Sequence, residues 1–113
     1  MPRRHAPFTL IRGDTWEIEG RLSATDGTPL DLSAAEIEWA LFTQSGQKFL
    51  SLMRDHGIVV TDAAAGAILI TVPADQSKHV EPGPYLDQLR VTIGGVVSTM
   101  WTGGVTVEFS AFT

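Results

Sequence analysis

The stretch EIEWAL, residues 36–41, sets apolar and polar side chains in alternation. Successive side chains of a β-strand point to opposite faces, so Ile37, Trp39 and Leu41 share one face and both glutamates lie on the other. This pattern indicates a strand with one buried and one wet face. The stretch WEIEGRL, residues 16–22, repeats the alternation, with its first tryptophan on the inward face. Both tryptophans are therefore predicted to belong to a core between β-sheets.

Turn signals separate such stretches at the short spacing of an all-β domain. Asp26-Gly27 is the clearest, because both residues tolerate the backbone angles of a tight turn. Residues 73–79 lack β-branched side chains and predict one helical turn that crosses between sheets. Gly103-Gly104 is read as a bend or bulge in the last strand. Strands are expected near 8–12, 15–24, 36–43, 47–53, 57–61, 67–72, 84–93 and 96–109.

This strand pattern favours an all-β fold, an Ig-like antiparallel β-sandwich of about seven to nine strands. Trp39 lies about where such sandwiches keep a core tryptophan, and Tyr85 begins a late strand like the tyrosine of a tyrosine corner. A small closed barrel is the structural alternative, because it has the same alternation and turn spacing. Residues 8–113 are expected to form one domain, and residues 1–7 an N-terminal arm.

Composition narrows the function classes. The chain has 113 residues, no cysteine and a formal net charge of −5. The missing cysteines exclude disulfides, thiolate metal sites and cysteine nucleophiles. The acidic balance argues against nucleic-acid binding. No apolar run is long enough to span a bilayer, and the polar start lacks the apolar stretch of a signal peptide. No nucleic-acid or membrane partner is therefore expected.

No catalytic, cofactor-binding or metal-binding residues are predicted, and the chain is not expected to be an enzyme. His5, His56 and His79 are far apart in sequence and are interpreted as surface histidines. The carboxylate pairs Glu17/Glu19 and Glu36/Glu38 are expected on solvent-facing sides of strands, wet and unperturbed. Residues 12–14 spell Arg-Gly-Asp, an adhesion tripeptide that a turn between strands also explains.

Partner binding has three candidate residues. Arg3 and Arg4 place two of the eight basic residues in the arm of an acidic protein. The arm is either a frayed terminus or a segment that becomes ordered on an acidic neighbouring subunit. The alternation around Trp101 does not show clearly whether its side chain points inward or outward. Because aromatic side chains contribute much of the energy of protein interfaces, Trp101 is a candidate anchor that faces a partner.

Several segments match, in order, the N-terminal domain of phage baseplate upper proteins and related prophage tail proteins. Each piece is a short turn-and-strand signature, and their order along nearly the whole chain supplies the specificity. The matching segments are LIRGDTW (10–16), DGTPLDLS (26–33), VTDAAAG (60–66), the turn at 73–75, PGPY (82–85) and GGVTV (103–107). The chain thus resembles this family.

The resemblance implies an Ig-like sandwich that acts without catalysis or cofactor as an attachment or adaptor module in a tail, baseplate or head–tail region. It implies multi-copy assembly with tail, baseplate, connector or capsid subunits, in the virion and, during assembly, in the host cytoplasm. Family members continue into longer distal regions, whereas this sequence ends at Thr113, just past the domain. We therefore expect an adaptor rather than a fibre. Two alternatives stay open: a capsid decoration protein, and a carbohydrate-binding or adhesion module. Two or more of Trp16, Trp39 and Trp101 coplanar on one exposed face would favour sugar binding, and two buried in the core would favour assembly.

Overall fold

The computed structural model describes residues 3–112, with only the backbone of Arg3. Within these residues the chain forms nine strands and one short helix. They are β1 (Arg3–Arg4), β2 (Phe8–Ile11), β3 (Trp16–Arg21), β4 (Glu36–Thr43), β5 (Lys48–Arg54), β6 (Gly57–Asp62), β7 (Ala67–Val72), α1 (Ala74–Ser77), β8 (Gly83–Ile93) and β9 (Val96–Glu108). The all-β prediction is confirmed.

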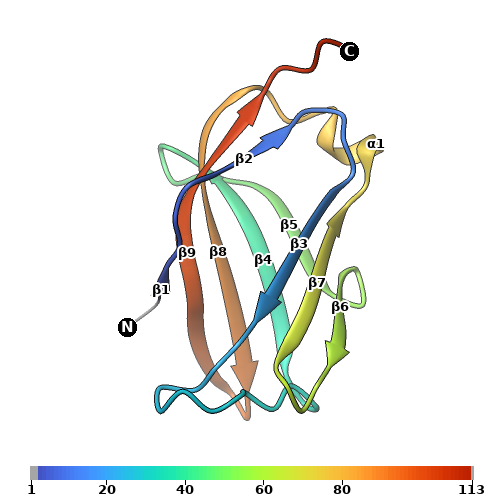
Figure 1. Ribbon diagram of the computed structural model, residues 1–113. Coiled ribbons are helices and arrows are strands. Elements are labelled where there is room, and N and C mark those ends of the chain that lie inside the picture. Colours follow the sequence, from blue (N-terminus) through green and yellow to red (C-terminus); the bar gives the residue numbers. More distant parts are fainter. Residues whose placement is uncertain (1–2, 113) are drawn as a thin grey trace.

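The strands form two facing layers (Figure 1). One layer contains β3, β7 and β6, and the other contains β5, β4, β8 and β9, with β1 and β2 on the outer edge of β9. A short parallel pairing of β5 with β6 joins the layers on one side. On the other side no pairing between β3 and β9 occurs among the described residues. The fold is therefore a sandwich whose strand path nearly closes into a barrel.

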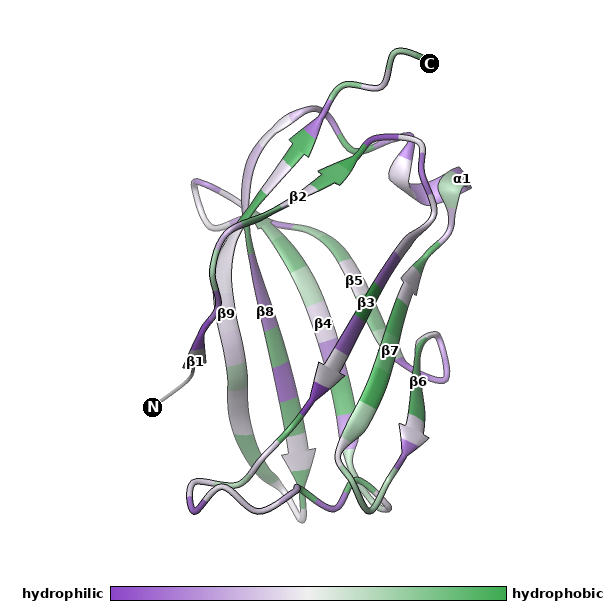
Figure 2. Cartoon of the chain, in the orientation of Figure 1, coloured by the Kyte–Doolittle hydropathy of each residue, from purple (hydrophilic) through white to green (hydrophobic). Residues whose placement is uncertain are grey.

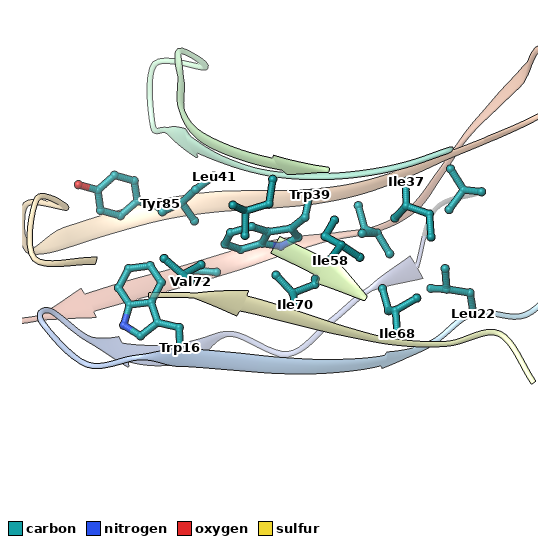
Figure 3. Packing of buried hydrophobic residues seen from close by; sticks show 14 of the residues in the cluster. Trp16, Leu22, Ile37, Trp39, Leu41, Ile58, Ile68, Ile70, Val72 and Tyr85 are labelled. Atoms are coloured by element: carbon teal, nitrogen blue, oxygen red, sulfur yellow. The ribbon is translucent and has the colours of Figure 1, made fainter. Parts of the chain in front are cut away.

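The core lies between the layers (Figure 3). Trp16 and Trp39 are both buried there, as predicted. β7 is hydrophobic along most of its length, because it is the middle strand of its layer, whereas β3 alternates between purple and green (Figure 2). The largest fully buried side chains are Trp39, Leu32, Ile37, Leu41, Ile58, Ile68, Ile70, Leu89, Val72, Val80, Val91 and Val105.

Local turn chemistry explains the connections. Gly27 adopts φ +89°, and the Asp26 carboxylate accepts the backbone N–H of Thr28, so the predicted turn is confirmed. The Tyr85 hydroxyl donates to the carbonyl of Glu81 at 2.7 Å, which confirms the tyrosine corner. The helical turn α1 carries the chain from β7 in one layer to β8 in the other, also as predicted.

Two strand predictions need correction. The strand predicted over 15–24 ends at Arg21, because the N–H of Leu22 donates to Gly66 in a loop. β1 was not predicted at all, because its two residues carry no periodicity from which a strand could be recognised. Its pairing with β9 depends on a contact almost a full chain length away.

Candidate functional site

A buried carboxylate on the inner face of β8 contacts three side chains from different strands and from the N-terminal segment. Asp87 lies on β8 and is fully buried. Its Oδ2 accepts hydrogen bonds from the indole N–H groups of Trp39, at 2.8 Å, and Trp101, at 2.9 Å. Its Oδ1 faces Nε2 of His5 at 2.5 Å. Burying a charge is costly unless it is paired and hydrogen-bonded, and these three donors meet that requirement.

Both ring nitrogens of His5 face acceptors. Nδ1 lies 2.8 Å from the carbonyl oxygen of Ala6, and Nε2 faces Asp87. A doubly protonated imidazolium, which donates from both ring nitrogens, suits this pair of acceptors. Burial lowers the pKa of His5, and the charge of Arg4 lowers it too, but hydrogen bonds to Ala6 and Asp87 and the charge of Asp87 outweigh both effects. The pKa of His5 is therefore raised above its ordinary value.

His5 belongs to residues 3–11, a segment that includes β1 and β2 and is called the strap. The strap runs along the outer edge of β9 (Figure 1). It is parallel to β9, with Arg3 level with Trp101 and Phe8 level with Val105. The His5 ring lies where a side chain at Gly103 would stand, since a Cβ there would overlap it. The strap thus closes this part of the β9 edge, and the ion pair with Asp87 anchors it.

These contacts correct two interpretations of the sequence. His5 is not a surface histidine but is partly buried against Asp87, because the strap carries it over the edge of β9. Gly103 and Gly104 form no bulge; they pair in register with Asp87 and Leu86 within β9, and Gly103 leaves room for the imidazole. One signal was present in the sequence, since Asp87 occupies an inward position in the otherwise apolar alternation of β8.

The three candidate partner residues lie close together on the backbone. Arg3 and Arg4 form β1, level with Trp101 and Thr102 of β9. Arg4 is exposed, while the side chain of Arg3 lies outside the described residues. Trp101 is half-buried, and its ring packs against Gly20 of β3 so closely that no Cβ would fit there. A role for these residues in partner binding stays a prediction.

The Gly20–Trp101 contact bridges the opening between β3 and β9, which is called the seam. Towards the β8–β9 hairpin, the seam widens into a cavity of about 790 Å³, the seam groove. Apolar side chains of both layers line it together with hydroxyl groups and one guanidinium group. Its lining consists of Arg21, Ser23, Ala24, Thr25, Leu30, Val91, Ile93, Val96, Ser98, Thr99 and Met100.

A second carboxylate network lies on the outer face of the β5–β4–β8 layer. Glu38 Oε2 accepts hydrogen bonds from Lys48 at 2.9 Å and Ser51 at 2.8 Å, and Oε1 accepts one from Arg90 at 2.6 Å. The bonds from Lys48, Ser51 and Arg90 outweigh partial burial and lower the pKa of Glu38 to about 2. The prediction of an unperturbed carboxylate was therefore wrong for Glu38, because cross-strand register surrounds it with cations.

The remaining motifs have structural explanations. The turn at residues 12–14 is tied to α1, since Arg12 Nε donates to the carbonyl of Lys78 and the N–H of Gly13 donates to Ser77. His56 and His79 are exposed, as predicted. Within residues 3–112 there is no cluster of three or more His, Cys, Asp or Glu suited to a metal ion. In the same part of the chain, no helix has the length and apolarity needed to cross a membrane.

No family model matches the chain, and no curated protein matches it in sequence. Solved structures do share its fold. The N-terminal domain of phage TP901-1 ORF48 superposes with a TM-score of 0.62 at 16% identity, over 96% of this chain and 90% of that domain. CopC from Methylosinus trichosporium OB3b superposes with a TM-score of 0.55 at 13% identity, over 93% of this chain and 86% of CopC. The chain therefore has a fold that a phage protein domain also has, along nearly its whole length.

Proposed function

We propose that this chain is a non-enzymatic structural protein of a tailed phage or prophage, an attachment or adaptor module in the tail, baseplate or head–tail region. The observation that carries the proposal is the end-to-end fold similarity to the N-terminal domain of phage TP901-1 ORF48. The segments that resemble the baseplate family add support, because they form the turns and strands of this same fold.

The positions of the tryptophans favour assembly over carbohydrate binding. Trp16 and Trp39 are buried in the core, where neither can stack on a sugar. Trp101 directs its indole N–H to Asp87 and its ring to Gly20. A stacking platform of coplanar exposed tryptophans therefore cannot form from this set. Exposed edge strands, by contrast, are suited to pairing with neighbouring subunits.

The proposal is tested in the strain that encodes the chain. Particles are induced and purified through a density gradient, and the copy number of the chain relative to the major capsid protein is measured by quantitative mass spectrometry. A fixed ratio across gradient fractions, lost on deletion of the gene and restored by a plasmid copy, is expected. Absence from purified particles would contradict the proposal. Cryo-electron microscopy then distinguishes an adaptor from a capsid decoration protein by the position of the added density.

A further inference from the structure

One part of the β9 edge lacks a strand partner among residues 3–112. Residues 96–99 pair with β8 on one side, whereas the strap pairs with β9 only from Trp101 onward. A strand edge presents a row of N–H and C=O groups that another strand can pair with. Val96 and Val97 at this edge are 68% and 57% exposed. The open edge is thus both apolar and capable of backbone hydrogen bonding.

The seam groove lies directly beside this open edge. Val96, Ser98 and Thr99 belong to both, while Val91, Ile93 and Met100 form an apolar part of the groove. A strand added to the edge would direct alternate side chains toward the groove and toward solvent. The strap already binds in this way farther along β9, where His5 extends from the added strand into the slot at Gly103.

The charge beside the open edge indicates what kind of strand would fit. Arg21 is the charged residue in the lining of the groove. A carboxylate on the added strand would complement Arg21, and apolar side chains would fill the groove.

We propose that the open edge at residues 96–99, together with the seam groove, accepts an extended strand of a neighbouring virion protein. This strand lies in line with β1, has apolar side chains at alternate positions and brings a carboxylate to Arg21. The inference rests on the proposed function and specifies its mode of attachment. An extended strand is favoured over a small ligand or a helix because only a strand satisfies the backbone groups of the edge.

Two matched substitutions test this inference. Val97→Asp places a charge on the open edge, and Val59→Asp places the same charge on β6 at a valine that is similarly exposed, at 54%. Both variants are expected to be folded monomers with unfolding free energies close to the unsubstituted chain, as measured by circular dichroism, light scattering and urea titration. In purified particles, Val97→Asp is expected to reduce incorporation at least tenfold, and Val59→Asp to leave it unchanged. Arg21→Glu should also reduce incorporation.

The outcomes separate the inference from the proposed function. If the unsubstituted chain is absent from particles, both fail. If it is present and Val97→Asp is incorporated equally well, the function stands and the inference fails. If the isolated chain forms a dimer that Val97→Asp dissociates, the edge binds a second copy and the assigned partner is wrong. Hydrogen exchange completes the test, because amides within residues 96–99 should be protected in particles and exchange faster in the isolated chain.

Discussion

One end of the outer edge of β9 pairs with the strap, and the other end has no strand partner among the described residues. From Trp101 onward the edge is covered by the strap, which supplies parallel backbone pairing and the ion pair of His5 with Asp87. Over residues 96–99 no other described segment supplies a second strand, and the edge borders the seam groove. Both ends belong to one continuous strand. The difference between them therefore comes from the strap, which contacts only one of the two ends.

This difference shows what closing an edge requires. β1 contributes only two residues, and so short a strand adds little stability by backbone pairing alone. The strap is anchored at this end by a side chain that enters the core and meets a buried charge. Removing parts of that anchor should make the covered end of β9 behave like the open end.

The largest effect is expected from Asp87→Ala. The substitution leaves the indole N–H groups of Trp39 and Trp101 and the imidazolium of His5 without their acceptor. The free energy of unfolding should fall by about 3 to 5 kcal/mol, as when one partner of a buried ion pair is removed. Urea titration followed by tryptophan fluorescence measures it. Asp87→Asn, which keeps one acceptor oxygen but removes the charge, should lose less than Asp87→Ala, and an Asp87→Asn chain as stable as the unsubstituted one would argue against a role for the charge.

His5→Ala should release the β1 end of the strap, because β2 keeps its own pairing with β9, and it should leave both tryptophan hydrogen bonds in place. At pH 6 the expected loss is about 2 to 3 kcal/mol, the range for hydrogen bonds to charged groups. Because folding raises the pKa of His5, the stabilisation is complete below the pKa of the unfolded histidine and is lost as pH rises through the raised value. The stability advantage of the unsubstituted chain over His5→Ala should therefore shrink as pH rises above 6.5. A constant difference would exclude an imidazolium.

Gly103→Ala tests the same anchor by filling the space that the His5 ring occupies. Its Cβ would overlap the His5 ring, whereas a Cβ at the neighbouring Gly104 would lie 3.9 Å from Pro7, an ordinary contact. Gly103→Ala is expected to cost about 1 to 2 kcal/mol, within the range for overpacking, and to increase proteolysis of the strap. Gly104→Ala serves as the matched control and should leave proteolysis unchanged. Equal proteolysis of the two variants would show that the slot does not hold His5.

The smallest effect is expected from Glu38→Gln on the opposite face of the sheet. Lys48 and Arg90 are about half exposed, so solvent screens these ion pairs and the expected loss at pH 7 is about 1 kcal/mol. Folding lowers the pKa of Glu38 from 4.5 to about 2, so its stabilisation is present above 4.5 and is lost as pH falls toward 2. The unfolding free energies of the unsubstituted chain and of Glu38→Gln, measured by urea titration across pH, should converge at low pH. If they stayed parallel, the network would not depend on ionisation of Glu38.

The strands could be predicted because their signal is local. The alternation of side chains in β4 and the turn at Asp26-Gly27 each depend on a few neighbouring positions. The same rules predicted burial of Trp16 and Trp39 and the crossover at α1. Where a strand ends depends on its neighbours, and for this reason β3 is shorter than its periodicity indicated.

The site could not be predicted in the same way, because its contacts join residues far apart in sequence. His5 and Asp87 are 82 positions apart, and nothing local to His5 indicates that it enters the core. Glu38 meets Arg90 only because β4 and β8 pair in one particular register. The inward position of Asp87 was readable from the alternation of β8, but its three donors were not.

Amide hydrogen exchange along β9 of the isolated chain, resolved by NMR, tests the central claim most directly. We predict slow exchange at edge amides paired with the strap at pH 6, after correction for intrinsic rates, and faster exchange there in His5→Ala. Edge amides within residues 96–99 should exchange fast in both chains. Uniform protection along β9, unaffected by the loss of His5, would contradict both the anchored strap and the open edge.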